Sequence, residues 1–383
     1  MKAIINCRIV TQEEILENKM LLFDEKILGI EDEKNKDQYL NKCEEVIDAG
    51  GLYVSPGFID VHIHGSGGCD TMDADLESLQ TIGTCIAQNG VTSFLPTTMT
   101  MSKEKIYLAL DVIREGMKLD YNGAKILGAH MEGPFISKKY KGAQKEDYIV
   151  NPEYLFIKDY TDVIKIITMA PEEDKNYEFI REVKSKTDIV LSLGHTSAAY
   201  DKAIEAINNG ISHATHTFNA MSAFNHREPG TVAAVLNSDV FSELIADKIH
   251  VHPEVFKILY KMKGKDRVIL ITDSMRAGCL RDGISELGGQ KVIVKDNSAR
   301  LEDGTLAGSI LKLNRGVANF KNSVGISMNE AINMASLNPA VELGLQNQIG
   351  SIEAGKLADL IIIDDEFNVS RTIISGKTVF RKN

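Results

Sequence analysis

The stretch GFIDVHIHGSGGCDTMDADLESLQTIGTCIAQNGVTSFLPT, residues 57–97, holds one complete strand–helix–strand unit. Short apolar runs at 57–63 and 92–97 are typical of buried strands. Between them, 75–89 carries apolar residues at helical spacing, namely Leu76, Leu79, Ile82 and Ile86. Gly90 follows directly, and glycine is typical of a helix C-terminus. The stretch therefore predicts a parallel βαβ unit.

The same alternation continues along the middle of the chain. Helical patterns recur at 102–118 and 198–209, the second ending at Gly210. Besides 57–63 and 92–97, strands are expected at 125–131, 163–169, 188–194, 211–215, 243–246 and 267–272. Eight strands alternating with helices predict a TIM (β/α)8 barrel.

Both chain ends have a β pattern instead. The β-rich runs are 3–10, 19–30, 46–54, 357–364 and 372–380. We therefore expect a small β-sandwich domain built from residues 1–53 and 350–383. The barrel domain would occupy residues 54–349, with a β insertion near 280–305 that includes the run 290–301.

Composition narrows the classes of partner. The 383 residues carry a net charge of −11, whereas a nucleic-acid-binding protein would show a basic face. A negative protein can still bind an anionic small molecule through local donors. The five cysteines form no CxxC pair, which is typical of reduced thiols. The N-terminus lacks the apolar core of a signal peptide, and the aliphatic run 360–363 is too short to span a bilayer. We expect a cytoplasmic protein without nucleic-acid or membrane partners.

Histidines and carboxylates follow the ends of the predicted strands. They are His62, His64, Glu132, His195, His216 and Asp273, with His250 a few residues after the seventh strand. The active site of a TIM barrel lies at the C-terminal ends of its strands. These side chains are therefore expected to meet at one mouth of the barrel.

Their chemistry suits a divalent metal. His62 and His64 are two apart on a strand, so they point to the same side. Glu132 ends a buried strand and needs a partner, for which a cation is the natural choice. One glutamate and two histidines, here Glu132, His195 and His216, leave a coordination position open, as a catalytic metal requires.

Three further polar residues have structural interpretations. Asp273 either caps the turn after its strand or carries a proton at the barrel mouth. His130 shares a side with Glu132 and is interpreted as a packing residue beside the site. His213 precedes His216 by three residues, so we expect it to point to the opposite face and to be structural.

Seven motifs make the chain resemble the amidohydrolase superfamily, and within it the deacetylases of N-acetyl amino-sugar 6-phosphates. VSPGFID, which opens the HxH strand, and GKLADL are general to the superfamily, whereas HMEGPF, HTFNAM and REPG are specific to the deacetylases. GHT and LAGS complete the set. In chain order the seven begin at residues 54, 130, 194, 216, 227, 306 and 355, so the resemblance runs nearly end to end.

The resemblance implies hydrolysis of the acetamide of N-acetylglucosamine 6-phosphate to glucosamine 6-phosphate and acetate. It implies that Glu132, His195 and His216 hold the principal divalent metal, zinc or iron. Because relatives with the His-x-His pair bind two metals, His62 and His64 permit one or two per subunit.

The resemblance also implies how the substrate is held. Asp273 would be the acid/base, and His250 would bind the sugar and polarise the acetyl carbonyl. The 6-phosphate would be bound by Asn219, the backbone of Ala220, and Arg227, which the neighbouring subunit of a homodimer supplies. The other implied contacts of this small-molecule substrate are Gln144, Leu306, Ala307 and Gly308. The loop SMRA at 274–277 departs from the small residues expected there and leaves its conformation open.

Three rival interpretations remain. The same chemistry on N-acetylgalactosamine 6-phosphate is not separated by the sequence. Cyclic-amide hydrolases of the dihydroorotase or hydantoinase type place a carboxylated lysine at the end of the fourth strand, where this chain has ITMA at 167–170. A binding protein on a degenerate barrel would be expected to have lost metal ligands, and here all of them are present.

Overall fold

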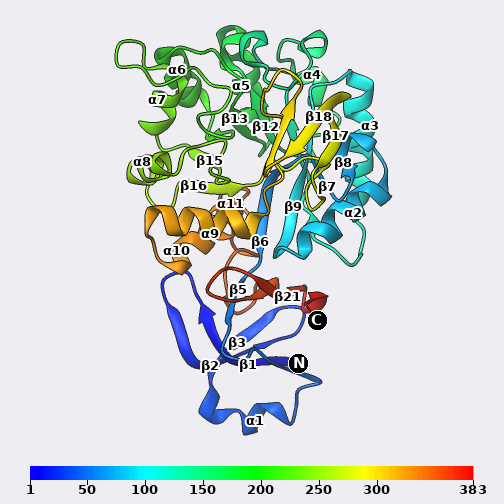
Figure 1. Cartoon of the computed structure of the whole chain (residues 1–383), viewed down its shortest axis with the longest axis vertical. Coiled ribbons are helices and arrows are strands. Elements are labelled where there is room, and N and C mark those ends of the chain that lie inside the picture. Colours follow the sequence, from blue (N-terminus) through cyan, green and yellow to red (C-terminus); the bar gives the residue numbers. More distant parts are fainter. Residues whose placement is uncertain (383) are drawn as a thin grey trace.

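The structure is a computed structural model in which residues 1–382 are described, and it has two parts. Figure 1 shows a ring of strands and helices above a smaller group of strands contributed by both chain ends. The strand β5 (Tyr53–Pro56) belongs to the lower sheet, and the next strand, β6 (Phe58–Ile63), enters the upper ring.

The upper part is the expected parallel barrel. Each adjacent pair of strands from β6 to β16 runs parallel. The remaining barrel strands are β9 (Val91–Thr98), β11 (Ala129–Glu132), β12 (Ile164–Met169), β13 (Val190–Leu193), β14 (His213–Ala214), β15 (Phe241–Ile245) and β16 (Val268–Ile271). The run expected at 125–131 divides into β10 (Lys125–Ile126) and β11, because Gly128 turns the backbone at φ 146°.

Helices surround the strands. The principal ones are α2 (Leu76–Ala87), α3 (Lys103–Gly116), α5 (Glu178–Lys186), α6 (Tyr200–Asn209), α7 (Gly230–Leu236), α8 (Pro253–Lys263), α9 (Leu313–Val324), α10 (Met328–Asn333) and α11 (Leu337–Glu342). The side chain of Asp75 caps α2 by accepting the Ser78 N–H at 2.7 Å. Of the predicted face, Leu79, Ile82 and Ile86 are buried and Leu76 is half-buried, which fixes α2 on the barrel.

The barrel is closed at its seam by backbone hydrogen bonds and by one buried side chain. Asp273 N donates to His62 O at 2.9 Å, which joins the ends of β6 and β16. Further into the barrel, Asp60 accepts from the hydroxyl of Thr272 at 2.6 Å and from its N–H at 3.3 Å. The Asp60 carboxylate, which is fully buried, thus takes the place of backbone acceptors between the first and last strands.

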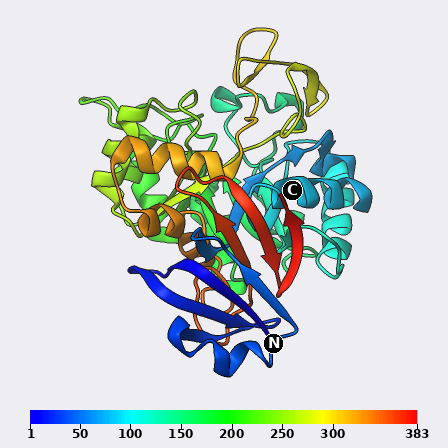
Figure 2. The same ribbon diagram turned by 60° about the horizontal axis from the view of Figure 1, so that its bottom comes forward.

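The lower part is a β domain made from both chain ends (Figures 1 and 2). Its strands form one sheet in the order β22-β21-β20-β5-β1-β2-β3, with β4 beside β1. The strands are β1 (Lys2–Val10), β2 (Ile15–Phe23), β3 (Ile27–Asp32), β4 (Glu45–Asp48), β20 (Leu360–Ile363), β21 (Val369–Ile374) and β22 (Lys377–Arg381). A core of aliphatic residues from both ends packs on it, including Ile4, Leu21, Val54 and Ile362.

Three of the predicted β runs each contain a turn. The run 46–54 divides at Gly50 and Gly51, and 372–380 divides at Ser375 and Gly376, all with positive φ. The run 19–30 divides between β2 and β3. The proposed domain boundaries at 53/54 and 349/350 stay a prediction.

The expected β insertion is a separate antiparallel sheet of β17 (Gly283–Leu287), β18 (Gln290–Lys295) and β19 (Ser298–Leu301). It is drawn in yellow beside the upper end of the barrel in Figure 1. Gln290 Nε2 donates to Ala143 O at 2.6 Å, which ties the insertion to the loop after β11. Within residues 1–382, no helix has the length and apolar character needed to cross a bilayer.

Candidate active site

A pocket opens where the barrel strands end, and it gathers most of the residues singled out in the sequence. The predicted site residues that line it are His64, Glu132, Gln144, His195, His216, Asn219, Ala220, His250, Asp273, Leu306 and Gly308. His62 does not line it but is fully buried next to Glu132. Six barrel strands, or the segments that follow them, thus deliver the predicted ionisable residues of the pocket.

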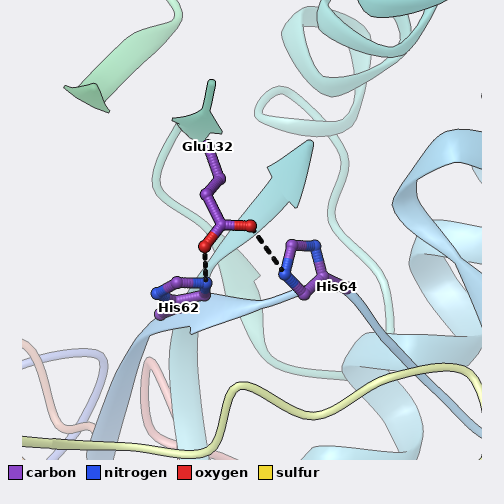
Figure 3. Close-up of side chains that lie close together, drawn as sticks. All are labelled: His62, His64 and Glu132. Atoms are coloured by element: carbon purple, nitrogen blue, oxygen red, sulfur yellow. Dashed lines mark ion pairs between the residues drawn. The ribbon is translucent and has the colours of Figure 1, made fainter. Parts of the chain in front are cut away.

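Glu132 lies at the centre of this group. Its Oε1 is 3.2 Å from His195 Nε2, 3.1 Å from His216 Nε2 and 3.4 Å from His62 Nε2. Its Oε2 is 3.4 Å from His64 Nε2. Figure 3 shows the carboxylate of Glu132 directed between the rings of His62 and His64. Four imidazoles from three strands or strand ends therefore face one carboxylate.

The other nitrogen of each ring is held by an acceptor. His195 Nδ1 lies 2.8 Å from Tyr140 O, and His64 Nδ1 lies 3.1 Å from Thr97 O. His216 Nδ1 lies 3.2 Å from Asn219 O. A carbonyl oxygen can only accept, so each Nδ1 donates to it, and Nε2 of each ring is left facing the carboxylate of Glu132.

This donor set fits a divalent cation. Glu132, His195 and His216 offer ligand atoms within 4.8 Å of one another, and so do His62, His64 and Glu132. His62 Nε2 is buried and has no hydrogen-bond partner among the described residues. A buried polar nitrogen without a hydrogen-bond partner is unfavourable, and a bound cation would satisfy it. Carboxylate and imidazole ligands suit a first-row transition metal.

The carboxylates of the cluster are ionised. Burial alone would raise the pKa of Glu132, but the neighbouring His195 and His62 outweigh it and hold this pKa well below its ordinary value. For Asp273, burial is likewise outweighed by His62 and His64, so its pKa is lowered. Asp273 Oδ1 lies 3.3 Å from His64 Nε2 and 3.5 Å from His62 Nε2. An ionised carboxylate at this position can accept a proton.

The backbone is strained at three of these residues. His195, His216 and Asp273 follow the fifth, sixth and eighth strands with φ of 47°, 29° and 48°, values that non-glycine residues rarely adopt. Such a conformation costs on the order of 1–3 kcal/mol per residue and persists only where the surroundings impose it. At Asp273, Ser309 N donates to the carbonyl at 2.7 Å. The sharp turns direct the side chains into the pocket.

Two further pocket residues are positioned by hydrogen bonds. Gln144 Oε1 accepts from Thr100 N at 2.8 Å, and its Nε2 donates to Glu132 Oε2 at 2.5 Å. His250 Nδ1 lies 2.7 Å from Asp247 Oδ2, which leaves Nε2 for the pocket. Gln144 therefore orients the central carboxylate, in addition to any contact that it makes with a ligand.

Two predicted substrate contacts lie outside the pocket of this chain. Arg227 is exposed and does not line it. Ala307 is fully buried and does not line it either, because its N–H pairs with Ala299 O at 3.0 Å against the β insertion. His252 is at the start of α8, where Nδ1 accepts from Glu254 N at 3.3 Å. His226 is exposed in the loop that carries Arg227.

His130 and His213 are both buried beside the cluster. His130 lies 2.8 Å from Val61 O and 2.7 Å from the hydroxyl of Thr168, and burial lowers its pKa to about 3, so the ring is neutral. His213 Nε2 lies 3.1 Å from Glu243 Oε1. Thr168 occupies the end of the fourth strand, where a cyclic-amide hydrolase of this superfamily would have a lysine.

Sequence reasoning missed Glu243, which lies next to the cluster on β15. Its carboxylate is fully buried and is 2.9 Å from His62 Nδ1. A signal was present, because residues two apart on a strand share a face. Glu243 therefore shares a face of β15 with Phe241 and Ile245, which are both buried. A carboxylate between two buried apolar residues requires a buried partner.

Comparisons with known proteins agree with this fold and this site. The sequence profile described as the Amidohydrolase family matches residues 53–379. The chain is 42% identical over 381 residues to N-acetylglucosamine-6-phosphate deacetylase of Bacillus subtilis (strain 168), covering 97% of this chain and 95% of the relative. It is 34% identical over 327 residues to N-acetylgalactosamine-6-phosphate deacetylase of Escherichia coli O157:H7, covering 84% and 86%.

A solved structure agrees as well. The crystal structure of N-acetylglucosamine-6-phosphate deacetylase from Pasteurella multocida superposes with a TM-score of 0.94 at 33% identity, covering 100% of both chains. Barrel, terminal β domain and mouth are thus those of a known class of hydrolases. The chain belongs to the amidohydrolase family.

Proposed function

We propose that this protein hydrolyses the acetamide of N-acetylglucosamine 6-phosphate, releasing acetate and glucosamine 6-phosphate. The observation that carries the proposal is the convergence of Glu132, His195 and His216 with Asp273 and His250 in one pocket at the barrel mouth. The 42% identity to a deacetylase of this substrate over nearly the whole chain supports it.

Glu132, His195 and His216 would hold a divalent cation, zinc or iron, and His62 with His64 would hold a second. When bound, such a cation lowers the pKa of water from ~16 to ~7 and polarises a carbonyl oxygen. The ionised Glu132 and the Nε2 atoms of His195 and His216 that face it are the features of this chain that suit the role.

Asp273 carries the proton in this reaction. As water attacks the acetyl carbonyl carbon, the ionised carboxylate accepts its proton. The C–N bond then breaks, and Asp273 returns the proton to the amine nitrogen of the sugar. His250 donates from Nε2 to the carbonyl oxygen as negative charge develops there, while Asp247 holds the other ring nitrogen.

The phosphate anchors the substrate and does not react. Asn219 and the backbone of Ala220 line the pocket and would bind it, together with Arg227 from the neighbouring subunit of a homodimer. A guanidinium binds phosphate through a charge-assisted bidentate pair, and this remote binding energy positions the amide.

Arg227→Ala is therefore expected to lower kcat/KM for N-acetylglucosamine 6-phosphate by about 10- to 150-fold, since charged hydrogen bonds contribute roughly 1.5–3 kcal/mol each. Unphosphorylated N-acetylglucosamine, assayed with the same variant, should be affected less than about threefold. Equal losses on both sugars would contradict the anchoring role. Light scattering of the wild type tests the homodimer separately.

The proposed reaction is tested by measuring acetate release from N-acetylglucosamine 6-phosphate, with the metal content determined on the same sample. Glu132→Gln should lose the cation and at least ~10³-fold in rate, because a cation supplies several kcal/mol of transition-state stabilisation. A metal-replete wild type that releases no acetate from this sugar would exclude the proposal. Faster release from N-acetylgalactosamine 6-phosphate would instead favour the activity named for the Escherichia coli relative.

A further inference from the structure

One contact separates His62 from the other three histidines of the cluster. His64, His195 and His216 each place Nδ1 against a backbone carbonyl. His62 Nδ1 instead lies 2.9 Å from the Oε2 atom of Glu243. A carboxylate partner makes the opposite nitrogen of an imidazole a stronger ligand than a carbonyl partner does, and it fixes the ring's tautomer and orientation.

Glu243 serves two elements of the site at once. The same oxygen, Oε2, accepts the backbone N–H of His216 at 2.9 Å. Both the His62 ring and the turn that presents His216 are therefore fixed to one atom of a fully buried side chain. On its other side, Oε1 lies 3.1 Å from His213 Nε2 at an ion-pair distance. His213 Nδ1 in turn lies 3.4 Å from Glu342 Oε1.

We propose that Glu243 is a positioning residue that directs His62 Nε2 at the cluster and so determines whether the His62–His64 side binds a cation. Glu243 does not touch the pocket itself, and its effect is exerted through His62 and His216. The inference rests on the cation centre of the proposed function. It goes beyond that function because it assigns the control of cation binding by His62 and His64 to a residue on β15.

The variants distinguish this role from a general structural one. Glu243→Gln keeps an oxygen for both donors but removes the charge, whereas Glu243→Ala removes both contacts. Glu342→Gln is the matched control, because Glu342 reaches the same His213 but lies on its far side, with Ser212 as its other partner at 3.1 Å. His62→Ala shows the full loss of the ligand.

Cobalt(II) alone is titrated into metal-free wild type and each variant, and the visible absorption spectrum reports stoichiometry and affinity. His62→Ala should abolish cobalt binding at the His62–His64 side. We expect Glu243→Gln to lower the cobalt affinity of that same side by about 10- to 100-fold. Glu243→Ala should weaken it further, with a changed spectrum, while Glu342→Gln binds like the wild type. Circular dichroism and unfolding midpoints identify any variant that fails to fold, and Glu243→Gln then decides the case.

Three results would overturn the inference. They are unchanged cobalt affinity in Glu243→Gln, an equal loss in Glu342→Gln, or a His62→Ala variant that binds cobalt like the wild type. A wild type that binds no cobalt would overturn the cation centre itself. Acetate release by the wild type, measured on the same preparation, shows separately whether the proposed reaction stands.

Discussion

The barrel mouth and the β domain are buried to the same degree but with opposite chemistry. At the mouth, His62, Glu132 and Asp273 are 0%, 2% and 8% exposed, and all three are ionisable. In the β domain, Ile4 and Ile362 are 0% and 2% exposed and apolar. One region encloses charge in the low-dielectric interior, and the other removes hydrocarbon from water.

The difference shows that the apolar β domain stabilises the fold, whereas the barrel mouth provides reactive groups at a cost in stability. Burial of aliphatic side chains stabilises the fold by roughly 25 cal/mol per Å² of apolar surface. Burial of ionisable groups does the reverse unless partners compensate, and the mouth adds strained backbone at His195, His216 and Asp273. Active sites commonly give up stability in this way. Substitutions in the two regions should therefore affect different measurements.

Asp273→Asn should have the largest effect, and it should be confined to catalysis. An amide cannot accept the proton of the attacking water, so we expect kcat to fall by ~10²–10⁴-fold, or ~3–5 kcal/mol in the barrier. Metal analysis should still find the cation held by Glu132, His195 and His216. If circular dichroism instead shows that the variant is unfolded, the mouth contributes to the stability of the fold as the apolar core does. The contrast between the two regions would then be wrong.

Ile362→Ala should have the converse effect. The side chain lies in the core shared by both chain ends, and its truncation leaves a cavity that costs ~2–5 kcal/mol of unfolding free energy. Denaturant unfolding measures the loss, and kcat per folded molecule should stay at the wild-type value. Ile284→Ala is the control, because Ile284 is 74% exposed on β17 and its truncation should change stability by less than ~0.5 kcal/mol. A substantial fall in kcat with Ile362→Ala would mean that the β domain shapes the mouth.

The barrel could be predicted from the sequence because its signals are local. Apolar runs, helical spacing and terminal glycines such as Gly90 and Gly210 are read within single segments, and all eight strands are present. Turns inside β-rich runs were missed. At Gly50–Gly51 and at Gly128 a glycine with positive φ divides what had been expected as one strand. Hydrophobic pattern alone does not report such backbone conformations.

The convergence of site residues could also be predicted, because the mouth of a parallel barrel collects whatever follows its strands. What the sequence could not supply are contacts between distant segments. The sequence predicts Gln144 as a sugar or phosphate contact. In the structure its Nε2 also donates a hydrogen bond to Glu132 Oε2. Ala307 was expected to line the sugar pocket, yet pairing with the β insertion buries it. The roles assigned to the ligands and to Asp273 stay predictions.

Thr272 makes a stabilising contact at the barrel seam and directly precedes a residue of the mouth, so it offers the finest test of the comparison. Its hydroxyl donates to Asp60 at the barrel seam, one residue before Asp273. Thr272→Val keeps the shape but leaves the buried carboxylate one donor short, which should cost ~1–3 kcal/mol of unfolding free energy. Because the seam also positions Asp273, kcat should fall several-fold, and this variant alone of the three should move both measurements.

The control for Thr272→Val is Thr98→Val in β9. Thr98 is fully buried, but its hydroxyl has no hydrogen-bond partner within the described part of the chain. Removing an unpaired hydroxyl relieves a desolvation cost, so this variant should be as stable as the wild type or more stable. If Thr272→Val matched it in both stability and kcat, the Asp60–Thr272 contact would not hold the barrel closed. Closure would then depend on packing and on the backbone bonds that join residues 62–65 to Asp273 and Ser274, and the mouth would be supported by the same apolar burial as the β domain.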